Sequence, residues 1–264
     1  RKNNKPFCRA LLFTKIPPAT STPTTSSLYQ YTGLAAASWD SLGPFRVRSA
    51  KRYVVFAMGT AQSQLLKANY YSKVTLIDDC VGAIVQTLKD RNLLDNTWIV
   101  FSSDHGEMLG DHGLLAKKVF YEGAVNVPCL FRPPNGQGQG STDALVNHLD
   151  IVATLIDICG AAPLQDSPSQ SIAPLLRGES ATSHRQAVLS ELGLPPSAFV
   201  MVRTNEHKLS ADAKTREPIE LYDLAEDPAE LHNLIEREDY AEIRQHLLTD
   251  VMNPMLSRLD TTAW

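Results

Sequence analysis

Residues 97–123 read TWIVFSSDHGEMLGDHGLLAKKVFYEG, and the interpretation of the whole chain starts from this stretch. Its first five residues form a continuous apolar run, which is typical of a buried parallel strand. Asp104 and His105 follow at the C-terminal end of that strand, and open α/β sheets bind ligands at this edge. A carboxylate oxygen and an imidazole nitrogen can reach one divalent cation, and Gly106 lets the backbone turn away. The stretch predicts two ligands of a metal site whose other ligands come from elsewhere.

An isolated Asp-His-Gly has a simpler explanation, in which the aspartate caps a turn and the histidine lies at the surface. The context here favours a functional interpretation. A second Asp-His-Gly follows at 111–113, then two lysines at 117–118, and then Tyr-Glu-Gly at 121–123.

The flanking sequence alternates between helical and strand-like patterns. Apolar residues recur at steps of three and four from Leu66 to Leu88, which predicts a long amphipathic helix before the apolar strand. After the motif, another apolar run at 125–131 predicts a strand, and a helix is expected from about 150 to 159, ending at Gly160. This alternation predicts an α/β fold with a mostly parallel central sheet flanked by helices.

The alternation of predicted helices and strands ends near residue 186. Short strand-like pieces without intervening helices predict a small antiparallel α+β subdomain, closed by a final helix within 239–259. We therefore divide the chain into a larger α/β part, 1–185, and a C-terminal subdomain, 186–264. The strands expected in the subdomain cover residues 187–192, 199–203, 207–210 and 219–224. Two more strands are expected near the N-terminus, at 6–13 and 53–58.

Composition excludes several classes of protein. The 264 residues are 43% hydrophobic and 20% charged with a formal net charge of −4, which is ordinary for a globular protein. No cluster of Lys and Arg suggests nucleic acid as a partner, and no apolar run reaches the roughly 18 residues of a membrane span. The chain starts Arg-Lys-Asn-Asn-Lys, without Met or a signal-like stretch, so we expect it to begin within a longer protein. Localisation and oligomeric state cannot be inferred.

The 97–123 stretch resembles the second signature of the sulfatase family, within the alkaline-phosphatase-like superfamily. Members carry a strand, Asp-His-Gly or Asp-Asn-Gly, a glycine-rich loop, a lysine, and an aromatic-Glu-Gly at near-fixed spacing. By this resemblance Asp104 and His105 are metal ligands, and Lys117, four residues before Tyr121, contacts the sulfate. His112 lies in the loop that faces the substrate in relatives. Further segments resemble the family at 70–79, 148–155, 171–179 and 220–234.

The resemblance implies a sulfuric ester hydrolase that acts on a small-molecule or glycan sulfate ester with one divalent cation, most simply Ca²⁺. Sulfatases use a formylglycine nucleophile, formed from the Cys or Ser of a C-x-P-x-R motif. None of the four cysteines, Cys8, Cys80, Cys129 and Cys159, begins such a motif, and the family's paired N-terminal aspartates have no counterpart. We expect both to lie ahead of Arg1, so that this chain alone is inactive.

The chain also departs from the family after its first strand. Relatives usually carry Pro-His-x-Pro there, with a histidine that helps to protonate the leaving group, whereas this chain reads Thr-Lys-Ile-Pro-Pro at 14–18. Two alternatives stay open. One is a phosphodiesterase or phosphonate monoester hydrolase of the same superfamily, with Mn²⁺ or Zn²⁺. The other is a non-catalytic relative that keeps the fold as a binding domain.

Overall fold

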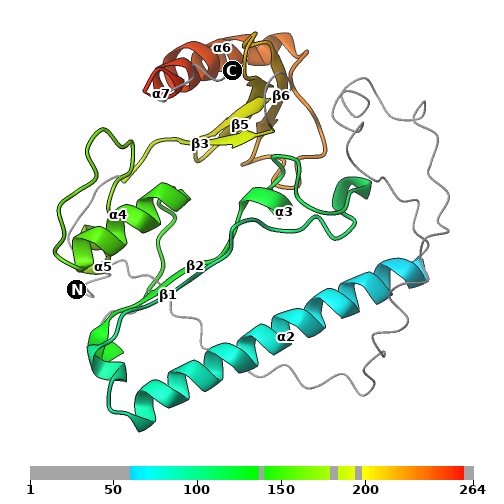
Figure 1. The fold of residues 1–264 in the computed structure, drawn as a ribbon. Helices are drawn as coiled ribbons and strands as arrows, with labels where there is room; N and C mark the ends of the chain where they lie inside the picture. Colours follow the sequence, from blue (N-terminus) through cyan, green and yellow to red (C-terminus); the bar gives the residue numbers. More distant parts are fainter. Residues whose placement is uncertain (1–59, 137–139, 179–183, 194–197, 259–264) are drawn as a thin grey trace, which may run out of the picture.

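The computed structural model describes residues 60–136, 140–178, 184–193 and 198–258, and the structural statements below concern this part of the chain. In chain order it forms a long helix, a two-stranded ribbon with an extended loop, a helical segment, and a C-terminal sheet covered by helices (Figure 1). The strands expected at 6–13 and 53–58, and the loop at 14–18, lie outside the described residues.

Helix α2 (Thr60–Asp90) confirms the long helix predicted from the apolar stripe at 66–88. It ends where Asn92 takes a left-handed backbone conformation, with φ 55°. The N–H of Leu93 then donates to the carbonyl of Leu88 at 2.8 Å. This is the hydrogen bond of a Schellman cap, which satisfies a carbonyl left free at the end of a helix.

The apolar stripe of α2 is only partly covered within the described residues. Ile77 is 51% exposed and Ile84 is 59% exposed, although both belong to the predicted buried face. Among the described helices, none combines the length and the apolar character that a membrane crossing requires.

The ribbon that follows α2 corrects the expected sheet direction. Strands β1 (Ile99–Ser102) and β2 (Cys129–Arg132) pair antiparallel, with Ile99 opposite Arg132 and Ser102 opposite Cys129. The two predicted strands are therefore present, but no parallel pair occurs among the described strands. The mostly parallel central sheet was a wrong expectation for this part of the chain.

The connection between the two strands explains the difference. A parallel pair needs a crossover, usually a helix, that returns the chain to the same end of the sheet. Residues 103–128 instead fold as a loop whose longest helix is α3 (Glu122–Val125), so the chain runs back along β1 in the opposite direction. The helices that suggested a parallel sheet lie before β1 and after β2. Short 3-10 turns occupy Leu94–Asn96, Asp111–Gly113 and Pro134–Gly136.

Helix α4 (His148–Ile158) confirms the helix expected at 150–159, and Gly160 ends it with φ 68°. The helix begins two residues earlier than expected, with Asn147 as the N-cap residue and Asp150 as the third helical residue. Each side chain accepts a hydrogen bond from the other's backbone N–H, which is a capping box. A short helix, α5 (Ala173–Leu176), follows.

The C-terminal part forms a four-stranded antiparallel sheet in the order β3-β4-β5-β6. Its strands confirm the four strand predictions, and the helical segment after them confirms the final helix. A π-helical stretch interrupts that segment at Leu247–Met252. The strands are β3 (Val188–Leu192), β4 (Phe199–Arg203), β5 (His207–Asp212) and β6 (Pro218–Asp223), and the helices are α6 (Ala241–His246) and α7 (Asn253–Leu256), preceded by a 3-10 turn at Glu238–Tyr240.

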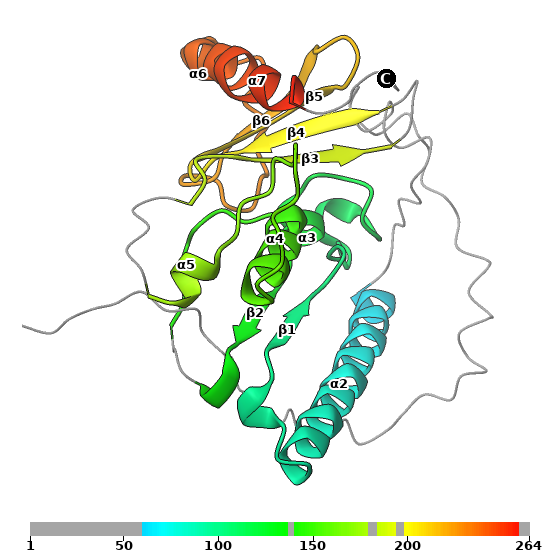
Figure 2. The ribbon, with the colours of Figure 1, turned by 60° about the vertical axis from the view of Figure 1, so that its left-hand side comes forward.

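The two faces of this sheet have different partners. Alternate side chains of a strand point to opposite faces, so Leu209 and Leu221 pack with the C-terminal helices in one core. On the other face, Lys208 and Tyr222 contact the loop between β1 and β2. Figures 1 and 2 show the sheet between the α6–α7 segment and the loop that carries α3. The proposed division at 185/186 stays a prediction, and these contacts cross it.

Candidate active site

Asp104 and His105 lie just beyond the end of β1, as the sequence predicts. Oδ2 of Asp104 is 3.3 Å from Nε2 of His105, and Oδ1 accepts the His105 backbone N–H at 3.0 Å. The Asp104 side chain is 84% exposed, and that of His105 is 35% exposed. Desolvation raises the pKa of Asp104. The His105 ring, the His105 backbone N–H and the Lys117 charge together outweigh this effect, so the pKa of Asp104 is lowered below its ordinary value.

The other nitrogen of His105 fixes which atom is available to a ligand. Nδ1 is 2.7 Å from the carbonyl oxygen of Gly106. A carbonyl can only accept, so Nδ1 carries the hydrogen and Nε2 presents its lone pair. The Lys117 ammonium lies in hydrogen-bonding contact with this Nε2. A metal-ligating histidine is held in the same way, with one nitrogen on a backbone carbonyl and the other toward the metal.

Three of the four predicted site residues are thus brought together: Asp104, His105 and Lys117. The pair Asp104 and His105 offers one carboxylate oxygen and one imidazole nitrogen toward a common point, which fits two ligands of a divalent cation. Within the described ranges, no group of three His, Cys, Asp or Glu side chains is arranged to hold a metal ion, so further donors are needed.

Gly106 is required by close contact with the returning chain. Its N–H donates to the carbonyl of Ala124 at 2.8 Å, and a Cβ at this position would lie 2.2 Å from the carbonyl oxygen of Gly123. No side chain fits into that space. The sequence indicated that a glycine lets the chain turn here. In the structure this turn also packs against the backbone of Gly123 and Ala124.

Glu107 shapes the loop and was not identified from the sequence. One of its carboxylate oxygens accepts the backbone N–H of Ala116 at 2.5 Å and that of Leu109 at 3.3 Å. The N–H of Met108 also donates to the carbonyl of Ala116 at 3.0 Å. These bonds fix the backbone immediately before Lys117. The only signal in the sequence was the position of an acidic residue inside a glycine-rich loop.

His112 makes a different contact from the other predicted residues. Its backbone is left-handed, with φ 55°, between two glycines that also have positive φ. Its ring stacks on Tyr121, with centroids 3.9 Å apart and planes inclined by 3°. Tyr121 is 7% exposed and belongs to a small core with Met108 and Tyr222. His112 is therefore attached to the part of the loop that contacts the C-terminal sheet.

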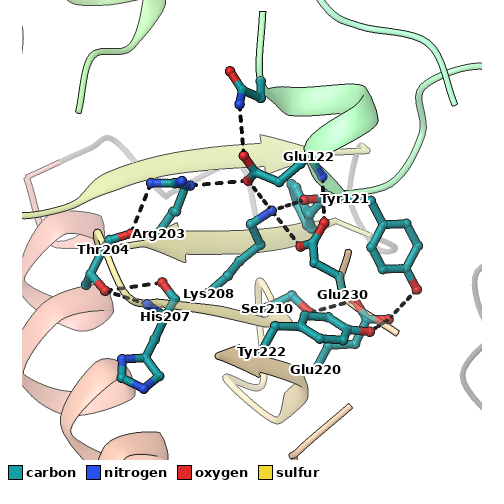
Figure 3. A network of polar contacts seen from close by, with 12 residues as sticks. Tyr121, Glu122, Arg203, Thr204, His207, Lys208, Ser210, Glu220, Tyr222 and Glu230 are labelled. Carbon is teal, nitrogen blue, oxygen red and sulfur yellow. Dashed lines mark hydrogen bonds and ion pairs between the residues drawn. The ribbon is translucent and has the colours of Figure 1, made fainter. Parts of the chain in front are cut away.

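Glu122 begins α3 and lies in a buried ionic network with the C-terminal sheet (Figure 3). Nζ of Lys208, which is 2% exposed, lies 2.6 Å from Glu122 and 2.7 Å from Glu230, and donates to the carbonyl of Phe120 at 2.9 Å. Burial raises the pKa of Glu122, but Lys208 and Arg203 outweigh it and lower the pKa. The sequence showed Tyr-Glu-Gly as a motif, but gave no partner for its glutamate.

Glu220 and Tyr222 of β6 face the same interface. Oε1 of Glu220 accepts from the hydroxyls of Tyr121 and Tyr222, at 3.1 and 3.3 Å, and Oε2 accepts from Ser210 at 3.4 Å. Burial, and next the charge of Glu220, raise the pKa of Tyr222. Burial also raises the pKa of Glu220 to about 7, against the lowering effect of the tyrosine hydroxyls and with a smaller rise from Glu230.

Comparison with solved structures defines the class of this fold. A protein in complex with its substrate D-glucosamine-2-N,6-O-disulfate is similar with a TM-score of 0.69 and 25% identity, covering 85% of this chain and 48% of the other. The phosphonate monoester hydrolase of Agrobacterium radiobacter is similar with a TM-score of 0.65 and 29% identity, covering 73% of this chain and 42% of the other. The class is the alkaline-phosphatase-like superfamily.

Two family models match the sequence of this chain and identify its family. The family model described as Sulfatase matches residues 16–161, and the model described as N-sulphoglucosamine sulphohydrolase, C-terminal, matches residues 110–255. The chain belongs to the sulfatase family. It is 34% identical to the choline-sulfatase of Rhizobium meliloti over 170 residues, which is 63% of this chain and 32% of the relative. The chain therefore spans about a third of the length of this relative and about half of the first solved structure.

Proposed function

We propose that this chain is part of a metal-dependent hydrolase of sulfate esters, with Asp104 and His105 as ligands of a divalent cation and Lys117 as the group that contacts the sulfate. The observation that supports this most directly is the convergence of these three side chains just beyond the end of β1. Membership of the sulfatase family supports the same reaction class. The substrate we propose is a small-molecule or glycan sulfate ester.

Each residue of the proposed site has a separate task. The cation, when bound, acts as a Lewis acid that polarises the sulfuryl oxygens. Asp104 supplies a carboxylate oxygen, and His105 supplies the lone pair of Nε2. Lys117 places positive charge where negative charge develops on the transferring group. His112 is proposed as a substrate-facing residue of the loop.

The identity of the cation is a separate proposal. The family resemblance suggests Ca²⁺, which like Mn²⁺ prefers oxygen ligands, whereas an imidazole ligand such as His105 suits Zn²⁺ better. Titration calorimetry with each of the three ions tests this on the chain as it stands. We expect Asp104→Asn and His105→Gln each to weaken binding by at least about tenfold. His232→Gln is the matched control, since the His232 side chain is 78% exposed, and unchanged binding in the two site variants would contradict the assignment.

The nucleophile is not proposed among these residues. No C-x-P-x-R motif occurs in the 264 residues, so we propose that this chain by itself does not turn over an aryl sulfate. Release of the phenol from such a substrate, dependent on added metal and lost in Lys117→Ala, would contradict that part of the proposal while supporting the site. In a longer protein that does turn over, Lys117→Ala should lower the rate roughly tenfold to a thousandfold.

A phosphonate monoester hydrolase is the second candidate, favoured by the structural similarity to the Agrobacterium radiobacter enzyme. The same three side chains could serve a phosphonate ester, because both substrates present anionic oxygens to a cation and a lysine. Competition between inorganic sulfate and phenylphosphonate for the metal-loaded chain separates the two. Tighter binding of phenylphosphonate, with a preference for Mn²⁺ or Zn²⁺, would favour the second candidate.

A further inference from the structure

We propose that Glu220, acting through Tyr121, is a positioning residue that fixes the imidazole of His112 in the site loop. The proposal rests on the proposed function only in taking His112 as substrate-facing. It assigns to the C-terminal sheet a direct part in shaping the site, through a chain of three side chains from β6 to the loop.

The His112 ring is held by its stack on Tyr121. The two rings are nearly parallel, 3° apart, and their centroids are separated by 3.9 Å. The His112 backbone has φ 55°, a left-handed conformation that costs a residue with a side chain roughly 1–2 kcal/mol and that glycine adopts freely. Because the two rings are stacked, the plane of the His112 ring follows the plane of the Tyr121 ring.

The Tyr121 ring, in turn, is oriented by its hydroxyl. It packs edge-on against Tyr222, with centroids 6.0 Å apart, and its hydroxyl donates to Oε1 of Glu220 at 3.1 Å. A cavity of about 30 Å³ lies beside the ring, with Phe199, Ile219 and Glu220 also in its lining. Packing on that side is therefore incomplete, and the hydrogen bond to Glu220 is needed to define the angle of the ring.

Glu220 is a well-held acceptor. It lies on β6 and is 6% exposed, and it accepts from Tyr222 and Ser210 as well as from Tyr121 (Figure 3). The charged groups nearby are engaged with one another, since Lys208 bridges Glu122 and Glu230. Each of the hydrogen-bond donors to Glu220 named above is therefore a hydroxyl group. Of these hydroxyls, the one on Tyr121 belongs to the ring that stacks on His112 in the site loop.

The test reads the His112 ring directly by NMR, on the 264-residue chain labelled at histidine. Measurements are made at pH 8, where an ordinary histidine is neutral. A ring stacked on tyrosine gives resonances shifted upfield, and His112→Gln identifies the His112 signals. We expect Tyr121→Phe and Glu220→Met each to move these signals toward those of the exposed His232. Glu220→Gln keeps an acceptor oxygen, and we expect it to retain the wild-type position.

A matched control removes a similar hydrogen bond elsewhere. The hydroxyl of Tyr240 donates to Oδ2 of Asp223 at 3.3 Å, so Tyr240→Phe deletes a tyrosine–carboxylate bond at the end of the same strand. It should leave His112 unchanged. Wild-type His112 signals in Tyr121→Phe or in a folded Glu220→Met variant would overturn the proposal, as would an equal shift in Tyr240→Phe. Tyr121→Phe removes only a hydroxyl, so it decides the matter if Glu220→Met does not fold.

A second readout separates this proposal from the proposed function. Inorganic sulfate is titrated into the metal-loaded chain while the His112 signals are followed. If His112 faces the substrate, sulfate should shift its signals, and Tyr121→Phe should weaken that response several-fold. If sulfate shifts the signals of His105 but leaves those of His112 in place, the substrate-facing role fails and His112 is a structural residue. The upfield position and its loss in Tyr121→Phe would then still establish the positioning by Glu220.

Discussion

At Gly106 the loop after β1 passes so close to Gly123 that a Cβ would lie 2.2 Å from its carbonyl oxygen. The atom in the way is backbone, so it cannot rotate aside. We expect Gly106→Ala to lower the free energy of unfolding by roughly 1–3 kcal/mol, the usual cost of overpacking. Because the displaced chain also carries Asp104 and His105, we expect metal binding to weaken with it. Chemical denaturation and calorimetry measure the two effects.

Gly82 provides the control for that substitution. It lies within α2, and a Cβ there would meet nothing within 4 Å. Gly82→Ala should therefore raise stability by up to about 1 kcal/mol, through helix propensity alone. If Gly106→Ala were as stable as the wild-type chain and bound metal equally well, the close approach of the two backbone segments could not be what holds the loop.

At the scale of elements, Asp150 joins α4 to the segment before β3. The Asp150 side chain is fully buried, and Arg185 donates to both of its oxygens, at 2.8 and 2.5 Å. Removal of the arginine takes the guanidinium from a buried carboxylate and leaves only the His184 ring, 3.4 Å away, as an ionisable partner, so Arg185→Met should cost roughly 3–5 kcal/mol at pH 7. Arg237→Met is the control, because Arg237 and Asp239 form an exposed pair that water and salt screen, so its removal should change stability little.

The pH dependence of this effect has a definite sign. Burial raises the pKa of Asp150, but Arg185 and two backbone N–H groups outweigh it and lower the pKa. The stability that the pair contributes is therefore complete above the ordinary pKa of an aspartate and is lost as pH falls through the lowered value. Without Arg185 the carboxyl can take up a proton in acid. Denaturation at pH 7 and pH 4 should thus show a smaller penalty for Arg185→Met at pH 4.

Glu220 of β6 should give a pH dependence of the opposite sign. Burial raises its pKa to about 7, so the folded protein holds a proton that the unfolded chain releases near pH 4.5. Stability from this group is present below the unfolded pKa and is lost as pH rises toward 7, by up to roughly 3 kcal/mol. Glu220→Gln should remove this decline. If the denaturation midpoints of the wild-type chain and of Glu220→Gln differ by a constant amount from pH 5 to pH 8, the raised pKa of Glu220 is contradicted.

Local sequence patterns predicted the helices and strands well, but they did not predict contacts between segments that are distant along the chain. The apolar stripe at 66–88 and the short runs of 187–224 depend on residues a few positions apart, so α2 and β3–β6 could be predicted. The antiparallel pairing of β1 with β2 depends on how 103–128 folds. That loop is set by close contacts, such as Gly106 with Gly123, which leave no periodic signal in the sequence.

The candidate site shows the same division. Asp104, His105 and Lys117 are found from a motif, because their spacing is fixed within one stretch of chain. Glu107 was missed, since nothing in the sequence says that its carboxylate accepts the N–H of Ala116. Glu220 was missed for a stronger reason, because its partner Tyr121 is ninety-nine positions away along the chain.

At the scale of the whole molecule, the site loop and the C-terminal sheet share one buried ionic contact. Lys208 on β5 bridges Glu122, at the start of α3, and Glu230, beyond β6. Lys208→Met keeps the apolar stem but removes the cation that pairs with the buried Glu230, while Glu122 keeps its contact with Arg203, so we expect a loss of roughly 3–5 kcal/mol. Hydrogen exchange should then quicken at the α3 amides, which lie on the loop side of the contact. Lys214→Met, at an exposed lysine of the β5–β6 turn, is the control.

The pattern of exchange decides how the molecule is organised. If the loop depends on the sheet, Lys208→Met will raise exchange in α3 as well as in β5, and unfolding will remain a single transition observed by both. If residues 1–185 and 186–264 were independent units, the substitution would speed exchange in β5 and leave α3 at the wild-type rate. We expect the first result, because Glu122 is bonded to the sheet through its side chain and, at 2.7 Å, through its backbone N–H to Glu230. The site loop would then fold only against the completed C-terminal sheet.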